Sequence, residues 1–427
     1  MQSGSEATGT DLPQDTINAA LVHTGSAMTS SERLSMRFSN VGHSFSHLFM
    51  LLYPTALLGL EAELGMSYAE LVALLTAGNV LFGLGALPAG WLGDRWDALR
   101  MMVLFFLGLG VASILTGLMS SAIGIGSGLA LMGLFASIYH PVGIAWLVRN
   151  ARSPGRVLGV NGVFGSLGIA SASLIAGLLT DLISWRAAFI VPGAACTITG
   201  LLLWRYIGDG TIVARQHDVQ ELHRDTPVEG RSRVFVVLTV AILCGGMMFQ
   251  ALSVVMPKLF AERLLQPGEF SALGAGGLVS LVYLIAAAAQ VLGGYLADRH
   301  TARSVYVGIY AILTPLLLVA AGMSGYGLVA VLAAVVFLQT GGIPVENVLL
   351  ARYSPPDRRG TVYGVKFVIA FGLAALAVPM VAALYEFAGG FFWVLVTLGG
   401  LAAVVALVSM FLPAVARPAS LPLPFGR

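Results

Sequence analysis

The sequence has few charged residues, almost no cysteine and almost no lysine. Charged residues make up 10% of the 427 residues, whereas soluble globular proteins contain about 25%. Hydrophobic residues make up 57%. This composition excludes an ordinary water-soluble domain and favours a protein that crosses a lipid bilayer several times. The formal net charge of +2 gives no indication of a nucleic-acid partner.

Other absences narrow the class of function. The two cysteines, Cys196 and Cys244, lie in apolar segments, so we expect neither a disulfide framework nor a cysteine-based zinc site. The sequence has no P-loop, no catalytic-triad spacing and no metal-hydrolase motif. We therefore expect neither an enzyme nor an ATP-driven pump, and no cofactor. Residues 1–34 are polar and lack the apolar core of a signal peptide, and we expect them to form a disordered cytoplasmic tail.

Long apolar segments are what the sequence does contain. A helix of about 20 apolar residues crosses the hydrocarbon core, and twelve segments meet this length, at residues 38–60, 69–93, 101–120, 122–148, 156–182, 186–207, 234–258, 271–297, 304–323, 326–352, 360–386 and 390–412. The sequence therefore predicts an all-α membrane protein with two six-helix halves, 35–207 and 234–412. A hydrophilic loop at 208–233 joins the halves, and residues 413–427 form a second tail.

The positions of the basic residues predict the orientation of the spans. Of the 23 lysine and arginine residues, all but four fall in segments that alternate spans place on one side. The exceptions are Arg186, Lys258 and Arg263 on the other side and Lys366 within a span. Because basic loops stay in the cytoplasm, we expect both termini, and the loop at 208–233, to be cytoplasmic.

The two halves carry an internal repeat. The segment "AGWLGDRWDALR" ends the second span and "GGYLADRHTARS" ends the eighth, so that Asp94 and Arg95 correspond to Asp298 and Arg299. Likewise "YHPVGIAWLVRN" in the fourth span corresponds to "GIPVENVLLARY" in the tenth. Transporters built from repeats bind their substrate between the repeats, near the middle of the membrane.

The twelve spans and the loop motif together resemble the major facilitator superfamily. The motif G-x-L-x-D-R consists of Gly90, Leu92, Asp94 and Arg95, with Arg100 following, and it recurs after the eighth span. The short motifs "SFSHL", "YHP" and R-x-L-G-x-x-G-x-x-G are similar to those of the fosmidomycin-resistance group of bacterial drug exporters. This resemblance implies a major facilitator fold, alternating access, export and a multi-pass position in the bacterial inner membrane.

The repeated loop motif is interpreted as a conformational latch. A carboxylate at a helix end can bind nearby arginines or the positive end of a neighbouring helix, and such a contact can favour one of two states. The alternative is an ordinary basic loop with a charge that stops translocation. The predicted latch residues are Asp94, Arg95 and Arg100 in the first half and Asp298, Arg299 and Arg303 in the second.

Five titratable residues lie within the spans. A charged side chain there costs about 2.5–3.5 kcal/mol on insertion scales, so His43, His47, His140, Glu346 and Lys366 are candidate functional residues. At 1.5 Å per residue, His47 and His140 both lie near the midplane and could approach each other. Imidazole changes charge near physiological pH, so this pair could carry a coupled proton or bind an anionic substrate.

Alternatives remain for each group. The histidines could simply connect helices by hydrogen bonds, or His43, His47 and His140 could bind a transition-metal ion. Glu346 and Lys366 lie at matching depth on consecutive spans and predict an ion pair, either structural or part of a gate. Further polar candidates for the pathway are Tyr53, Tyr139, Asn161 and Gln250.

The sequence thus predicts a proton-coupled secondary active transporter for a small organic molecule that is drug-like or anionic. Its expected partners are the substrate, protons and the lipid bilayer, and the expected state is a monomer. The alternative is uptake or efflux of a transition-metal ion or metal chelate through the three histidines.

Overall fold

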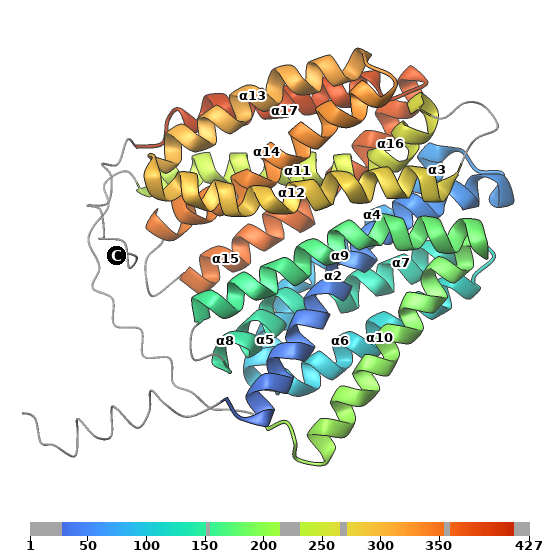
Figure 1. The fold of residues 1–427 in the computed structure, drawn as a ribbon, viewed down its shortest axis with the longest axis vertical. Coiled ribbons are helices and arrows are strands. Elements are labelled where there is room, and N and C mark those ends of the chain that lie inside the picture. Colours follow the sequence, from blue (N-terminus) through green and yellow to red (C-terminus); the bar gives the residue numbers. More distant parts are fainter. Residues whose placement is uncertain (1–27, 151–153, 214–230, 265–270, 354–358, 414–427) are drawn as a thin grey trace, which may run out of the picture.

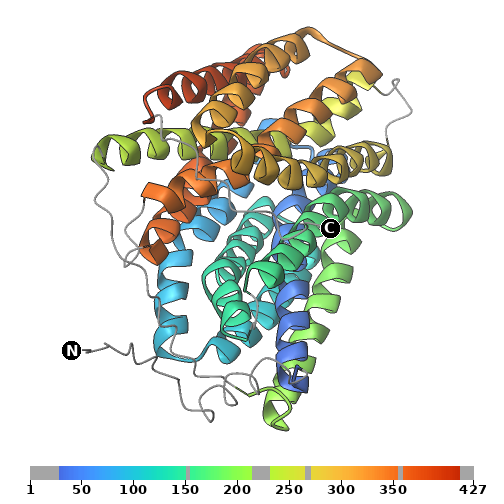
Figure 2. The same ribbon diagram turned by 60° about the vertical axis from the view of Figure 1, so that its left-hand side comes forward.

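The computed structural model describes residues 28–150, 154–213, 231–264, 271–353 and 359–413. Throughout these residues the regular elements are helices, and they form two bundles, the first half below the second in Figure 1. The two bundles stay separate layers when the molecule is turned by 60° (Figure 2). This is the predicted arrangement of two helical halves.

The first half contains two spans that are broken into shorter helices. Ser67 and Ser121 begin α3 and α7 as N-caps, accepting hydrogen bonds from Glu70 N (3.3 Å) and Gly124 N (3.2 Å). The elements in chain order are α2 (Ser30–Leu64), span two as α3 (Tyr68–Ala73), α4 (Leu75–Leu84) and α5 (Ala86–Arg95), α6 (Ala98–Leu118), span four as α7 (Ala122–Ala136), η1 (Tyr139–Gly143) and α8 (Ile144–Arg149), α9 (Pro154–Leu182) and α10 (Trp185–Gly208).

The second half is more regular and contains one broken span. Ser271 caps α12 by accepting a hydrogen bond from Gly274 N at 3.1 Å, and Thr301 caps α13 in the same way. The elements are α11 (Arg231–Leu264), α12 (Ala272–Arg299), α13 (Ala302–Gly322), α14 (Tyr326–Tyr353), span eleven as α15 (Arg359–Phe367), η3 (Val368–Gly372), η4 (Leu373–Leu376) and α16 (Ala377–Ala388), and α17 (Phe392–Ser409).

The apolar length of these helices supports a membrane location. In the described part of the chain, 11 helical segments are long and apolar enough to cross a membrane, and they correspond to predicted spans two to twelve. The remaining predicted span is α2, which has 35 residues. Polar residues such as Asn40, His43 and His47 dilute its apolar sequence. The predicted all-α architecture is confirmed, and α2, the span with the most polar sequence, carries His43 and His47.

The first helix begins earlier than the sequence indicates. Thr29 accepts a hydrogen bond from Glu32 N (3.1 Å), and the Glu32 carboxylate accepts one from Thr29 N (2.8 Å). This capping box starts α2 at Ser30, so residues 30–34 are helical and not part of a disordered tail. Residues 1–27 of the predicted tail, 214–230 of the predicted central loop and 414–427 of the predicted C-terminal tail lie outside the described residues.

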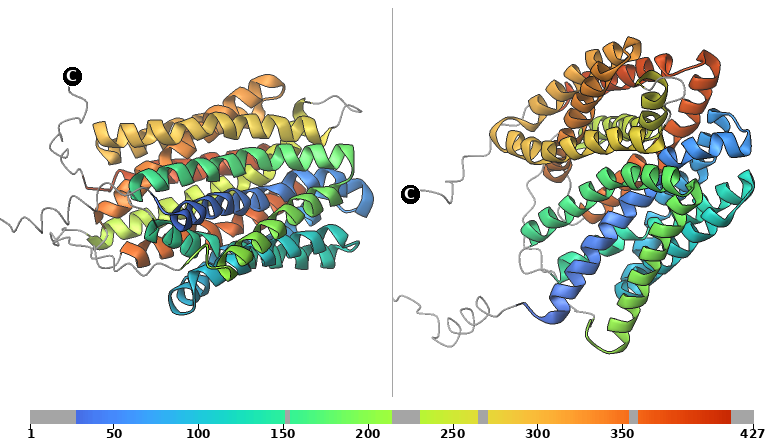
Figure 3. Two further views of the ribbon diagram at one scale, coloured as in Figure 1. Left: turned by 60° about the horizontal axis from the view of Figure 1, so that its bottom comes forward. Right: turned by 45° about the vertical axis from the view of Figure 1, so that its right-hand side comes forward.

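Polar contacts join the two halves at one end of the molecule. We call the end where α2 begins the terminal end and the opposite end, where α12 begins, the distal end. At the distal end the Asp181 carboxylate of α9 accepts hydrogen bonds from Ser271 Oγ (2.6 Å), Ala272 N (3.1 Å) and Leu273 N (2.7 Å). It thereby caps a helix of the other half, and Figure 3 shows α9 and α12 running side by side.

A second group of distal contacts connects α2 and α3 with α11. Lys258 forms an ion pair with Glu61, and Tyr68 Oη donates a hydrogen bond to the Val254 carbonyl at 3.2 Å. These contacts and the Asp181 cap together hold the halves closed at the distal end in this conformation.

Candidate functional site

Two of the spans contain π-helical turns, and both turns lie where the halves meet. Span four widens at η1, which includes Pro141, a residue with no N–H to donate to a regular helix. Span eleven widens at η3 and then tightens into the 3-10 turn η4. Because π-helical turns inside α-helices often mark functional sites, these two turns direct attention to the residues that they carry.

The three histidines of the first half form one buried cluster. The ring centroids of His43 and His47 are 4.9 Å apart, those of His47 and His140 are 5.3 Å apart, and those of His43 and His140 are 5.5 Å apart. One ring nitrogen from each residue lies within 4.8 Å of the others. The π-helical turn η1 presents His140 to the two histidines of α2, as their predicted depths suggested.

Hydrogen-bond partners assign the protons of the neutral cluster. His43 Nδ1 lies 2.8 Å from the Asn161 carbonyl, which can only accept, so His43 Nδ1 donates. His43 Nε2 then accepts from His47 Nε2 at 3.2 Å. His47 Nδ1 and both ring nitrogens of His140 are buried and have no partner among the described residues. In the neutral cluster, two nitrogen lone pairs therefore accept no hydrogen bond, and one N–H donates none.

Polar neighbours hold the cluster in place. Asn161 Nδ2 donates hydrogen bonds to Asn40 Oδ1 (3.0 Å) and Tyr139 Oη (2.9 Å). Tyr139 stacks on the His43 ring at 5.0 Å. The sequence indicated Asn161 and Tyr139 but not Asn40, although Asn40 lies one turn before His43 on the same helix face.

Space for the cluster comes from a glycine of α9. A Cβ at Gly165 would lie 2.6 Å from His43 Cε1, closer than a real Cβ contact allows, so a larger residue would push the ring away. Gly165 lets α9 and α2 approach until His43 can reach the Asn161 carbonyl. The glycine therefore has a packing role that its sequence alone does not reveal.

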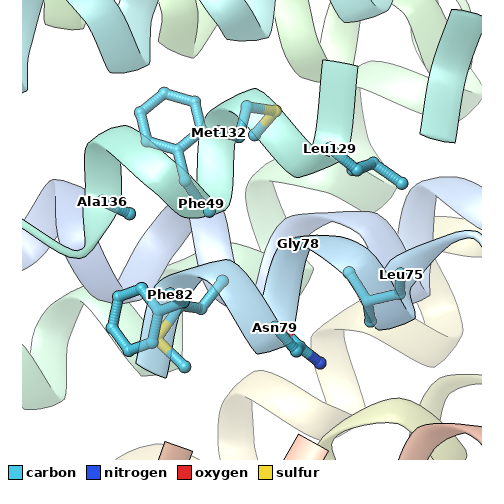
Figure 4. Close-up of a pocket in the computed structure, with 10 residues that line it drawn as sticks. Phe49, Leu75, Gly78, Asn79, Phe82, Leu129, Met132 and Ala136 are labelled. Atoms are coloured by element: carbon cyan, nitrogen blue, oxygen red, sulfur yellow. The ribbon is translucent and has the colours of Figure 1, made fainter. Parts of the chain in front are cut away.

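An apolar hollow lies beside the cluster, within the first half. Its lining comes from spans one, two and four and includes the Asn79 amide among apolar side chains (Figure 4). Phe82 belongs to this lining and also packs edge-on against His140 at 5.9 Å. Its cavity volume is about 20 Å³, room for about one water molecule, so in this conformation the hollow is too small for an organic ligand. The full lining is Phe49, Met50, Leu75, Gly78, Asn79, Phe82, Leu129, Met132, Gly133 and Ala136.

The second half contains a buried ion pair. Lys366 Nζ lies 2.7 Å from Glu346 Oε1 and donates to Asn347 Oδ1 at 2.5 Å. Tyr306 Oη donates to the other carboxylate oxygen, Glu346 Oε2, at 2.7 Å. Both charged residues are 8% exposed. The structure brings together the pair that the sequence predicts, and it adds Tyr306 and Asn347, for which no sequence signal was found.

Two phenylalanines of span eleven contact the histidine cluster. The ring centroid of Phe367 lies 5.3 Å from that of His140, and that of Phe371 lies 5.8 Å away, both in stacked orientation. Phe371 also packs edge-on against Phe82 at 5.2 Å. His140 of the first half is thus in direct contact with aromatic rings of the second.

Two other predicted pathway residues lie apart from these groups. Tyr53 is buried, and its hydroxyl donates to the Leu71 carbonyl at 2.8 Å, so it connects α2 with α3. Gln250 of α11 is 2% exposed, and its Nε2 has no hydrogen-bond partner among the described residues. Gln250 therefore offers an unused donor near the middle of its span.

The arginines of the two loop motifs behave alike. The Arg95 guanidinium lies 4.4 Å from the Trp91 ring centroid, and the Arg299 guanidinium lies 4.5 Å from that of Tyr295. Each arginine thus packs against an aromatic ring one turn earlier in its own helix. The internal repeat extends to this packing.

The structure describes only some of the side chains of the predicted latch. Asp97, two residues after Arg95 of the loop motif, accepts a hydrogen bond from Leu99 N (2.9 Å) and so caps α6. Arg100 pairs with Asp97 at 3.8 Å. The side chains of Asp94 and Asp298 lie outside the described residues, so the latch stays a prediction.

Comparisons with known proteins agree with this architecture. A family model described as Major Facilitator Superfamily matches residues 41–279 and 238–427. The puromycin resistance protein pur8 of Streptomyces alboniger is 31% identical over 153 residues, 35% of this chain and 30% of that protein. The D-galactonate transporter of Escherichia coli is 23% identical over 380 residues, 82% of this chain and 87% of that protein.

A third relative and two solved structures complete the comparison. The inner membrane transport protein YnfM of Escherichia coli is 28% identical over 151 residues, 35% of this chain and 36% of that protein. The matches to pur8 and YnfM thus span about a third of each protein. A bacterial homologue of the human lysosomal transporter Spinster shares the fold, with a TM-score of 0.69 at 15% identity over 91% of this chain and 95% of that one. A second structure of a bacterial Spinster homologue has a TM-score of 0.66 at 14% identity, over 89% of this chain and 94% of that one.

Proposed function

The chain belongs to the major facilitator superfamily as a multi-pass membrane transporter, and we propose that it couples proton movement to the transport of a small organic molecule. The proposed setting is the bacterial inner membrane, with both termini in the cytoplasm, as the basic loops suggest. The proposed unit is a monomer. The resemblance of its short motifs to drug exporters favours efflux.

The observation that carries the proposal is the histidine cluster. Two nitrogen lone pairs, one on His47 and one on His140, are buried beside an interface between the halves and accept no hydrogen bond from the described residues. A buried acceptor without a donor is costly, and a proton would supply the missing donor. Burial opposes the charge that this proton brings, so the rings would take it up when an opened pathway brings water or an anionic substrate to them and release it when the site closes again.

The chemistry of the site and of the relatives favours an organic substrate. Aromatic rings from both halves, those of Phe82 and Phe367, pack on His140, and an anionic substrate would compete with Glu346 for Lys366 in the second half. The printed names of two relatives refer to puromycin and to D-galactonate, an antibiotic and a carboxylate. We therefore propose a drug-like or anionic substrate that binds between the halves.

Alternating access follows from the way the halves are joined. In this conformation the distal end is held by the Asp181 cap and the Glu61–Lys258 ion pair. If the terminal end is cytoplasmic, these contacts close the side away from the cytoplasm. Opening that side requires the contacts to break, and the loop motifs around Asp94 and Asp298 would stabilise the alternative state.

A transition-metal ion is the second candidate, because the three ring nitrogens lie within 4.8 Å of one another. The group has no carboxylate or thiolate among the described residues, and the relatives named above refer to organic compounds. Proton-coupled transport of an organic molecule therefore accounts for more of the observations. The experiment that tests it also tests metal binding.

A ligand-induced thermal shift of the purified protein tests the proposal. Organic anions, antibiotics and divalent metal ions are screened at about pH 6 and about pH 8, on either side of the ordinary imidazole pKa. A ligand at 100 times its Kd stabilises the folded state by about 2.7 kcal/mol. The double variant His47→Ala/His140→Ala is compared with His300→Ala, a matched control at an exposed position.

We expect an organic compound to raise the melting temperature in a pH-dependent way, in the control but not in the double variant. Flux of that compound into proteoliposomes should then follow an imposed pH gradient. A shift with metal ions alone would replace the proposal with the metal alternative. An organic shift that the double variant retains would return the histidines to a structural role.

A further inference from the structure

Span eleven contacts both the histidine cluster and the Glu346–Lys366 ion pair, through neighbouring residues. Lys366 pairs with Glu346 within the second half at 2.7 Å. The next residue, Phe367, packs on His140 of the first half, and Phe371 packs on the same ring one turn later. The last two residues of the short helix α15, Lys366 and Phe367, therefore contact the ion pair and the histidine cluster, respectively.

The backbone after α15 is irregular. The chain passes through the π-helical turn η3 and the 3-10 turn η4 before α16 begins at Ala377. The hydrogen-bond register changes twice within residues 368–376, and such departures from α geometry are where helices bend. The α15 segment can therefore change its angle to α16 without unfolding either helix.

A close crossing of the two halves lies at this irregular segment. A Cβ at Gly83 of α4 would lie 2.0 Å from Gly372 N, so the two backbones touch with no side chain between them. The distal part of the span is tied separately, because the Tyr385 hydroxyl donates to Glu262 and the Tyr385 ring packs on Tyr68 at 4.7 Å. The crossing holds the end of η3 at Gly372 and the tie holds α16, so α15 is the part that can pivot.

We propose that α15 couples the two titratable groups, with Phe367 and Phe371 as the positioning residues that transmit the state of His140 to the Glu346–Lys366 pair. The inference rests on the proposed proton-coupled function. A cation attracts the face of an aromatic ring more strongly than a neutral group does. A proton on His140 therefore changes its contact with both phenyl rings, α15 pivots at the π-helical turn η3, and the geometry of Lys366 relative to Glu346 changes with it.

In the described part of the chain, the other titratable groups whose contacts with these residues are given below belong to the same two clusters. Around His140 they are His43, His47 and Tyr139, and the rings from α4 and span eleven that pack on it are phenylalanines. Around the ion pair they are Tyr306, which bonds to Glu346, and Tyr310, whose ring lies 4.9 Å from that of Tyr306. The phenylalanines themselves carry no charge, so they transmit a position and not a proton.

Distances between spin labels in the full-length protein test the inference without a known substrate. The buried Cys196 and Cys244 are first replaced by alanine. One label pair, at Val160 and Val365, reports on α9 and α15, and a second pair, at Ile183 and Phe387, reports on the distal end; all four positions are exposed. Each pair is measured at about pH 8 and about pH 5.5, where imidazoles change charge.

In the otherwise unchanged protein we expect the Val160–Val365 distance to shift by roughly 2–5 Å between the two pH values, the size of known helix movements. In Phe367→Leu/Phe371→Leu the shift should fall to less than half. The shift should return in Phe367→Tyr/Phe371→Tyr, which keeps both rings. Phe249→Leu is the matched control, since its ring packs on Tyr283.

The outcomes separate the inference from the function on which it rests. A full shift in the double leucine variant would overturn the coupling through Phe367 and Phe371 and leave proton coupling intact. No shift in the protein with all its phenylalanines would overturn this inference, and the flux in proteoliposomes under a pH gradient then decides separately whether proton coupling stands. If the leucine variant melts at a much lower temperature, the tyrosine variant decides, because a lost shift with both rings present also overturns the inference.

Discussion

The two halves hold their titratable groups in opposite ways. In the first half, the three histidines have more ring nitrogens than hydrogen-bond partners, and neither nitrogen of His140 has a partner among the residues that the structure describes. In the second half, Glu346 and Lys366 are paired, and both carboxylate oxygens have a donor. The halves derive from one repeat, so this difference is a divergence of the side chains on a shared framework.

The comparison separates two properties that one site could not combine well. A compensated pair is stable only while both charges are present, because a single buried charge is expensive. A neutral cluster whose nitrogen lone pairs accept no hydrogen bond can take up a proton without breaking an existing hydrogen bond, once water or an anion compensates the new charge. We infer that the histidine cluster of the first half binds the proton, and that the Glu346–Lys366 pair of the second half responds to it by a change in its geometry.

Breaking the pair should have the largest effect on stability. Lys366→Ala leaves the buried Glu346 carboxylate without its cation, and we expect the free energy of unfolding to fall by about 3–5 kcal/mol. The double variant Glu346→Leu/Lys366→Met removes both charges, and it should recover most of that loss. Unfolding of the purified protein in detergent measures both, and an equal loss in the double variant would show that packing, not charge, dominates.

Removing the least-bonded ring should have a much smaller effect. His140→Leu conserves volume approximately and breaks no hydrogen bond among the described residues, so we expect a change below about 1.5 kcal/mol. His43→Leu is the comparison, since it removes bonds to Asn161 and His47 and should cost about 1–3 kcal/mol. The same unfolding assay ranks them, and a larger loss for His140 than for His43 would contradict the proton assignment made here.

Much of this comparison is visible in the sequence. Hydropathy and the repeat predict the spans, and residue depth alone predicts the approach of His47 to His140 and of Glu346 to Lys366. The Thr29–Glu32 capping box is visible in "TSSE", so the start of α2 was predictable in principle. These features depend on local spacing, which a single sequence records directly.

Contacts between the halves are a different matter. Phe367 and Phe371 belong to an apolar span in which every face is hydrophobic, so periodicity cannot tell which rings cross to His140. The π-helical turns shift the helix face by one residue, and only Pro141 gives a hint of one of them. The Asp181 cap joins residues 90 positions apart, and such pairs follow from tertiary packing that one sequence does not encode in its spacing.

The first half also contains an exposed ion pair, Glu63–Arg186, which can be compared with the buried Glu346–Lys366 pair. Glu63, at the distal end, accepts hydrogen bonds from Trp185 Nε1 (2.6 Å) and Arg186 (2.7 Å). The Trp185 and Arg186 hydrogen bonds hold the pKa of Glu63 below its usual value. This stability is present above the ordinary carboxyl pKa and is lost as the pH falls through the lowered one.

Because Glu63 is 45% exposed, water and salt screen its pairing, and Glu63→Gln should cost only about 0.2–1 kcal/mol at neutral pH. The variant should also lose less stability on acidification than the unchanged protein, since its amide does not titrate. Melting temperatures at neutral and acidic pH, in low and high salt, measure both effects. A loss as large as that of Lys366→Ala, or one that salt does not reduce, would mean that burial is not what separates the two pairs.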